Sequence, residues 1–320
     1  MLSRRSLAAA LGGWCVVGTC ASRTFATGPM PKTPVVFEVP RGACDTHVHV
    51  IGEADKFPMS AGRDSTPPPA TADDLGEMLR LLHFDRVVIV TPDVYDTGNS
   101  ATLDAIRRLG RARARGVAWV AENTPTDVLD RMSGAGIAGI RVSLSQDGSF
   151  QAATAVKRLH AQFELAKQHG WHVETAPPPD VVAALAGEFA SSPVPVILHT
   201  FGWVEGGIAQ SGFDAILSLV ESGHVYVKLS EPYRLSKKGP DYPDLMPVVR
   251  ALVAANPDRL LWGSGWPYLS GPVPGRAKYD LAPALPIDAG HLLNLFSQWV
   301  PDAETRYKIL VDNPAQLYGF

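Results

Sequence analysis

The chain has 320 residues, of which 46% are apolar and 19% charged, and its formal net charge is −3 at pH 7. This composition is typical of a globular protein with a large core. The weak negative charge argues against binding to nucleic acid or to anionic membranes.

The first 26 residues differ from the rest and are predicted to be an export signal. Ser3-Arg4-Arg5 precedes an apolar run of about a dozen residues, too short to cross a bilayer and typical of a signal peptide. The arginine pair with Leu7 resembles a twin-arginine signal, which predicts a periplasmic protein with no membrane attachment after cleavage. An ordinary secretory signal or a membrane-tethered N-terminus is the alternative.

Cysteine usage fits this interpretation. Cys15 and Cys20 lie in the predicted signal, so Cys44 would be the one cysteine of the mature chain and no intrachain disulfide is expected.

A proline-rich arm at 27–41 is followed by a predicted single domain at 42–320. Short apolar runs in this domain have the length and the Val/Ile content of buried parallel strands. The eight runs are 43–49, 86–91, 116–121, 138–143, 171–175, 195–200, 224–230 and 259–264.

Helical spacing separates these runs. Apolar residues fall at i, i+3, i+4 and i+7 from Leu75, with Thr71 as the expected N-cap, and similar patterns cover 152–170, 180–190, 213–222 and 242–255. Eight strands alternating with helices predict an α/β fold, a single (β/α)8 TIM barrel. A doubly wound open sheet is the alternative, but its glycine-rich phosphate loop is absent after the first run.

A barrel carries its chemistry on the loops that follow its strands, so we expect the Pro/Gly/Ser-rich segments 52–69 and 267–286 to border the mouth. His47 and His49 are the most informative residues at a strand end. Side chains at i and i+2 of a strand point to the same face, so both imidazoles are expected to face the lumen. His199, at the end of another apolar run, is expected to join them.

Several motifs in this order resemble the amidohydrolase superfamily, and most closely the branch of the 2-pyrone-4,6-dicarboxylate lactonases and related sugar-lactone enzymes. The motifs are Cys44-Asp-Thr-His-Val-His, Gly139-Ile-Arg-Val, Val196-Ile-Leu-His-Thr-Phe-Gly, Val227-Lys-Leu-Ser-Glu-Pro-Tyr-Arg, Trp262-Gly-Ser-Gly-Trp-Pro-Tyr and Asp312-Asn-Pro. The resemblance implies a (β/α)8 barrel and a lactonase that works without a metal. It also implies that His47, His49 and His199 are catalytic and that Arg141 and Arg234 bind a substrate carboxylate, the role for which guanidinium is suited.

The chain departs from this pattern at the eighth strand. Gly265 stands where the lactonases keep a water-activating aspartate, and Tyr268 stands where they keep a histidine, so Tyr268 is a candidate contact for the substrate. The tyrosine expected after the fifth strand is Ala176 here. Asp147 stands near the place of a second arginine, and a third expected arginine is missing near Trp203.

Two acids, Glu174 and Asp93, are candidates to replace the missing aspartate. Glu174 shares the lumen-facing side of its strand with Ala176, so it is either a general base or metal ligand, or an ion-pair partner of Arg141 or Lys228. Asp93 is a second candidate base or substrate contact, although a turn role suits its loop position. Glu231 is expected to orient Arg234.

Three functions follow from these residues. The first is an exported, metal-independent hydrolase of a small anionic lactone, or alternatively one with a divalent ion such as zinc at His47, His49, Glu174 and His199. The second is a non-catalytic periplasmic protein that binds a small acid. The third is a lactone isomerase, which needs no activated water. The sequence does not predict the oligomeric state.

Overall fold

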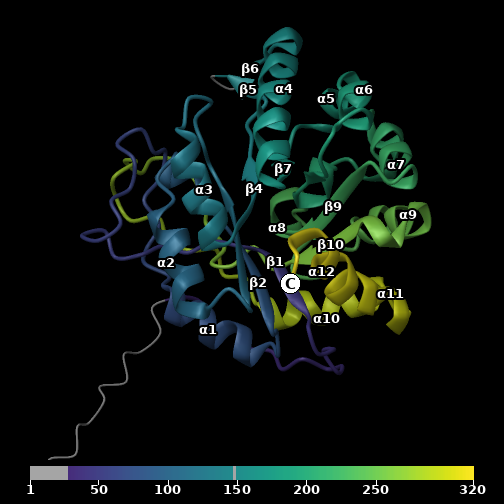
Figure 1. The fold of residues 1–320 in the computed structure, drawn as a ribbon. Coiled ribbons are helices and arrows are strands. Elements are labelled where there is room, and N and C mark those ends of the chain that lie inside the picture. Colours follow the sequence, from purple (N-terminus) through teal and green to yellow (C-terminus); the bar gives the residue numbers. More distant parts are fainter. Residues whose placement is uncertain (1–27, 147–148) are drawn as a thin grey trace, which may run out of the picture.

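The computed structural model describes residues 28–146 and 149–320, so the predicted export signal and Asp147 lie outside the described residues. The predicted (β/α)8 barrel is confirmed by one sheet of eight parallel strands with helices around it (Figure 1). In sheet order the strands are β1 (Cys44–Val48), β2 (Arg86–Val90), β3 (Ala114–Ala118), β4 (Ile137–Arg141), β7 (His172–Thr175), β8 (Val196–Leu198), β9 (Val225–Ser230) and β10 (Leu260–Gly263). Each overlaps one of the eight predicted runs.

A small hairpin after β4 was not predicted. It pairs β5 (Ser145–Gln146) with β6 (Ser149–Phe150) in an antiparallel arrangement. Because its strands have two residues each, it leaves no periodic pattern in the sequence.

The helices agree with the predicted spacing, with two differences. The main helices are α1 (Ala72–Leu81), α2 (Ser100–Leu109), α3 (Thr126–Ala135), α4 (Ala152–His169), α5 (Pro179–Ala184), α6 (Ala186–Ala190), α7 (Phe213–Glu221), α8 (Pro232–Leu235), α9 (Met246–Ala255), α10 (Ala289–Trp299), α11 (Ala303–Tyr307) and α12 (Asn313–Tyr318). Thr71 caps α1 in a full capping box with Asp74. The helix predicted at 180–190 divides at Leu185, and α9 begins four residues late because Tyr242 has φ 44°, which no right-handed helix contains.

The barrel closes between its first and last strands. The amide of Gly265 donates to the carbonyl of His47 at 2.8 Å, and the amide of His49 donates to the carbonyl of Trp266 at 2.7 Å. The Thr46 hydroxyl adds a bond of 2.8 Å to the carbonyl of Trp262. The two strand ends that carry the predicted site are therefore fixed to each other.

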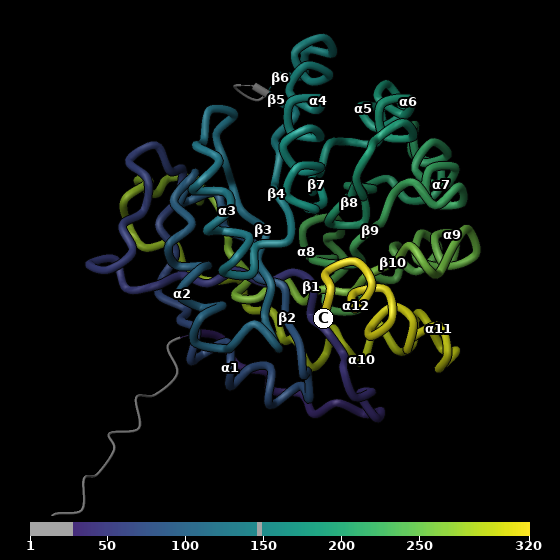
Figure 2. Tube along the Cα trace, in the orientation of Figure 1, coloured from purple at the N-terminus to yellow at the C-terminus, as the bar shows by residue number. Residues whose placement is uncertain are grey.

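The C-terminus closes the opposite end of the barrel. Tyr318 of α12 packs with Cys44, Ile197 and Leu261 in a buried cluster, and its carbonyl accepts a hydrogen bond of 3.0 Å from Nε of Arg115. Figure 2 shows the C-terminus near the middle of the ring of helices. The lumen is thus a packed core at this end, as in other barrels of this type.

Three smaller features complete the fold. The N-terminal arm lies along α10, where Asn294 accepts from the amide of Val36 at 2.9 Å and donates to the carbonyl of Pro34 at 2.8 Å. Cys44 is buried and free. Among the described residues, none of the helices has both the length and the apolar character needed to span a membrane.

Candidate active site

A polar cavity of about 230 Å³ lies at the C-terminal mouth of the barrel. Its lining includes all three predicted histidines, His47, His49 and His199. Ser65 and Leu269 also line it, one from each of the two predicted loops. The positions of these loops at the mouth are therefore confirmed.

The three imidazoles converge. The ring centroid of His47 lies 5.2 Å from that of His49 and 5.1 Å from that of His199. Burial lowers the pKa of all three, to about 3 for His49 and well below the usual value for His199, where Arg141 adds to the effect. All three rings are therefore neutral at pH 7.

Hydrogen bonds determine the tautomers of two rings. Nδ1 of His49 lies 2.8 Å from the carbonyl oxygen of Val90, which can only accept, so Nδ1 carries the proton. Nδ1 of His199 lies 2.9 Å from the Thr200 hydroxyl, which donates its one hydrogen to Glu231 at 2.9 Å. Nδ1 of His199 must therefore donate to Thr200, and Nε2 of both rings keeps its lone pair.

Glu174 lies behind this group rather than in it. The side chain is fully buried, and its Oε2 accepts from Nζ of Lys228 at 2.5 Å, while Oε1 faces Nδ1 of His47 at 3.3 Å. Burial alone would raise the pKa of Glu174, but Lys228 and His47 hold it well below its usual range. Glu174 does not line the polar cavity. Of the two roles left open by the sequence, this position supports the ion pair with Lys228.

Glu231 was expected only to orient Arg234, but its carboxylate also lies beside the histidines. Arg234 does bind it, from Nε to Oε1 at 2.6 Å, but Oε2 lies 3.6 Å from Nε2 of His47 and accepts from Thr200. Burial alone would raise the pKa of Glu231, but Arg234 and the histidines lower it, so the carboxylate is charged. The sequence did contain a signal for this position, because Glu231 directly follows β9 and barrel enzymes carry catalytic groups at the ends of their strands.

The volume beside Gly265 is filled. A Cβ atom on Gly265 would lie 2.4 Å from the hydroxyl of Tyr233 and 2.5 Å from Cγ of Glu231, and the φ of this glycine is +74°. Any side chain here would collide with both residues. The carboxylate of Glu231 thus lies beside the place where a side chain of residue 265 would project.

The two predicted carboxylate-binding arginines both line the polar cavity, but in different states. Arg234 is paired with Glu231 and donates to the carbonyl of Leu269 at 3.1 Å. Nη1 of Arg141 lies 3.2 Å from Oδ1 of Asp93, whose side chain is 67% exposed. Arg141 is therefore the cation that an incoming anion can reach, because water readily replaces an exposed partner. Asp93 lies at the rim, which does not support its predicted role as a base.

Tyr268 does not lie where a substrate contact would. Its side chain is buried, and it packs edge-to-face on Tyr233 with ring centroids 6.0 Å apart. It does not line the polar cavity. Its position supports a packing role behind Glu231 and argues against the predicted contact.

The turn after His199 is strained. Thr200, Phe201, Gly202 and Trp203 have φ of 52°, 54°, 65° and 60°, so four consecutive residues are left-handed. This conformation costs roughly 1–2 kcal/mol for each non-glycine residue. The turn presents Thr200 to Glu231 and Trp203 to the cavity. Strain of this kind persists where the surrounding structure enforces it, commonly at functional sites.

The donor atoms of the site fit a divalent cation. Ligand atoms of His47, His199 and Glu231 lie within 4.8 Å of one another. Nε2 of His47 lies 3.6 Å from the charged carboxylate of Glu231, and imidazole nitrogens with a carboxylate are a ligand set that suits a divalent cation such as zinc. This set differs from the predicted one, because Glu174 approaches His47 from its other ring nitrogen and Glu231 supplies the carboxylate.

The sequence and the fold are similar to those of known hydrolases. Residues 44–320 match the amidohydrolase family model. The chain is 35% identical over 297 residues to a 4-sulfomuconolactone hydrolase of Rhizobium radiobacter, covering 91% of this chain and 95% of that protein. It is 31% identical over 301 residues to a 2-pyrone-4,6-dicarboxylate hydrolase of Comamonas testosteroni, covering 88% and 92%. A solved structure from Pseudomonas putida, described as a 2-pyrone-4,6-dicarboxylic acid hydrolase, superposes with a TM-score of 0.69 at 26% identity, covering 88% and 98%.

The buried histidines predict a stability that falls in mild acid. His49 stays neutral in the folded chain with a pKa of about 3, but in the unfolded chain it takes up a proton near the ordinary histidine pKa of 6.5. The unfolded state therefore binds more protons below about pH 6.5, and from about pH 7.5 to about pH 5.5 this one group should remove about 1.4 kcal/mol from the free energy of unfolding. Urea denaturation at both pH values measures this change in the free energy of unfolding. His49→Gln should lose about 1.4 kcal/mol less than the wild type, and an equal loss in both proteins would contradict the assignment.

Proposed function

The chain belongs to the amidohydrolase family, and on this premise we propose that it hydrolyses a small lactone that carries a carboxylate. The observation that carries the proposal is the convergence of three neutral imidazoles and the buried carboxylate of Glu231 at the mouth of the barrel, beside Arg141. The names of relatives at 35% and 31% identity, both lactone hydrolases, support it.

Arg141 is the proposed anchor for the substrate carboxylate. Its side chain is only 15% exposed, whereas its partner Asp93 is 67% exposed and can turn into solvent when the substrate binds. Guanidinium forms two parallel hydrogen bonds with a carboxylate, which would fix the lactone ring relative to His199. Arg234 contributes mainly through Glu231, whose charge it balances.

The proposed base is His199. Its free Nε2 takes a proton from the water that attacks the lactone carbonyl, and the C–O bond of the ring then breaks. The departing oxygen of the lactone ring takes that proton from the imidazolium. The products are a hydroxy acid and the neutral imidazole of His199. Nδ1 donates through Thr200 to Glu231, so the carboxylate stabilises the imidazolium while it exists.

We further propose that Glu231 supplies the acid that the related lactonases carry at the position of Gly265. Glu231 extends from the end of β9 into the volume where a side chain of residue 265 would lie. The carboxylate would then come from the end of β9 instead of the end of β10, while still lying among the histidines. A glycine at 265 is the condition for this arrangement, since any larger residue would displace Glu231.

This proposal predicts that Glu231→Gln, which keeps the volume but removes the charge, lowers kcat/KM for a carboxylated lactone by roughly 10²–10⁴-fold. His199→Asn should cost a similar factor, and the double variant little more, because the two residues act as one unit. Asp104→Asn, on the outer surface, is the control. Near-normal rates for a folded Glu231→Gln would overturn the assignment, and thermal unfolding of each variant would check folding.

Metal independence is also part of the proposal, because the steps above use the chain's own groups. A divalent ion such as zinc would be held by His47, His199 and Glu231 and would polarise the lactone carbonyl as a Lewis acid. Dialysis against a chelator, with metal analysis of the protein before and after, should leave kcat/KM unchanged. A rate that falls with metal loss and returns with added zinc would overturn metal independence and leave the lactonase proposal standing.

We propose that the protein acts in the periplasm after export through its twin-arginine-like N-terminus. The support is the sequence of the first 26 residues alone. Replacing Arg4 and Arg5 together by lysine should keep the full-length precursor in the cytoplasmic fraction of a bacterial host, whereas the unaltered chain appears as a shortened form in the periplasmic fraction. Periplasmic recovery of the double variant would contradict the twin-arginine route.

A further inference from the structure

A second and larger cavity opens beside the three histidines. Its volume is about 430 Å³, against about 230 Å³ for the polar cavity. Asp93, Arg141, His199 and Trp203 line both, so the two cavities adjoin at the proposed anchor and base. A lactone held at Arg141 and His199 would therefore have the larger cavity directly beside it.

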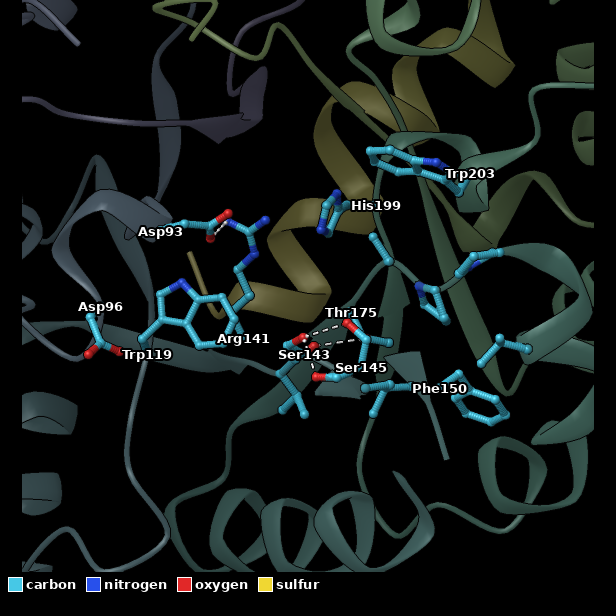
Figure 3. A pocket seen from close by; sticks show the side chains of 16 residues that line it. Asp93, Asp96, Trp119, Arg141, Ser143, Ser145, Phe150, Thr175, His199 and Trp203 are labelled. Carbon is cyan, nitrogen blue, oxygen red and sulfur yellow. Dashed lines mark hydrogen bonds and ion pairs between the residues drawn. The ribbon is translucent and has the colours of Figure 1, made fainter. Parts of the chain in front are cut away.

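Apolar side chains form more than half of the lining of this larger cavity. Trp119 lies next to Arg141, whose guanidinium carbon is 5.4 Å from the centre of its ring, and Trp203 lies next to His199 (Figure 3). Leu144, Pro178 and Val181 are also part of the lining. Two indoles with aliphatic side chains and a proline form a surface suited to a flat apolar group.

The charges around the larger cavity argue against a second anion on the substrate. Among the described residues that line it, Asp93 and Asp96 are acidic and Arg141 is the one arginine or lysine. Once Arg141 holds one carboxylate, a second would face two aspartates without a partner, which disfavours dicarboxylates.

The strained turn that carries Trp203 supports a functional role for its indole ring in the larger cavity. Three non-glycine residues keep left-handed backbone so that Thr200 can bind Glu231 and Trp203 can face both cavities. One short turn thus connects the indole in the larger cavity to the carboxylate of Glu231, and strain of this kind is common at functional sites.

Resting on the proposed lactonase function, we infer that the substrate is a monocarboxylated lactone with a flat apolar substituent, aromatic or conjugated, that occupies the larger cavity between Trp119 and Trp203. The size fits, because an apolar cavity of about 150 Å³ already holds benzene. The carboxylate binds Arg141, and the ring carbonyl faces His199. The substituent replaces water along the apolar wall.

The test compares three lactones that share one ring and one carboxylate but carry a phenyl group, a methyl group or a second carboxylate at the same ring carbon. We expect kcat/KM for the phenyl lactone to exceed that for the methyl lactone by at least about tenfold, with the dicarboxylate slowest. Equal rates for phenyl and methyl, or a preference for the dicarboxylate, would overturn this inference alone. No hydrolysis of any of the three would count against the proposed function itself.

Variants of the wall show where the preference arises. Trp119→Ala and Trp203→Ala should each bring the phenyl-to-methyl ratio of kcat/KM close to one. Val181→Phe narrows the same cavity without altering the strained turn and should lower the ratio as well, so the test does not depend on the folding of a tryptophan variant. Trp171→Phe, just before β7 at the opposite end of the barrel, is the matched control and should keep the ratio. An unchanged ratio in folded Trp119→Ala and Val181→Phe would overturn the inference.

Discussion

The site depends on a line of ionisable side chains in the lumen of the barrel, in which the neutral His47 lies between two charged carboxylates. Lys228 binds Glu174 at 2.5 Å, Glu174 faces His47 at 3.3 Å, His47 lies 3.6 Å from Glu231, and Glu231 binds Arg234 at 2.6 Å. All of these groups except the partly exposed Arg234 are buried, and each carboxylate has a basic partner on the side away from His47. Removing one member of such a buried pair costs about 3–5 kcal/mol, because the remaining charge loses its partner. Because both carboxylates must keep their basic partners, His47 stays between them, and the imidazoles of His49 and His199 pack against it.

The barrel allows this line to form because its strand ends converge on one small volume. β1 supplies His47, β7 supplies Glu174, and the end of β9 supplies Glu231. An acid can therefore reach the histidines from any of several strands, provided that the neighbouring position leaves room. Gly265 leaves that room here, and its left-handed backbone allows the turn that joins the last strand to the first.

Much of this architecture could be predicted from the sequence, because strands and lumen-facing histidines follow from period-two patterns and from short apolar runs. The roles of the acids could not. Glu231 and Gly265 are far apart in the chain, and their shared volume depends on the left-handed backbone of Glu231, which no periodicity reports. Glu174 was correctly expected to face the lumen, but its depth, and so its pairing with Lys228, depends on the tilt and stagger of the strands.

The closure of the barrel at both ends has a consequence for synthesis. β1 completes its hydrogen bonds only with residues 262–266, and Tyr318 seals the far end of the lumen from the last helix. β1 must therefore wait until residues 262–266 have been synthesised before its final partner is available. During this interval the open edge of β1 is exposed, and an exposed edge is the part of a sheet that pairs with other chains.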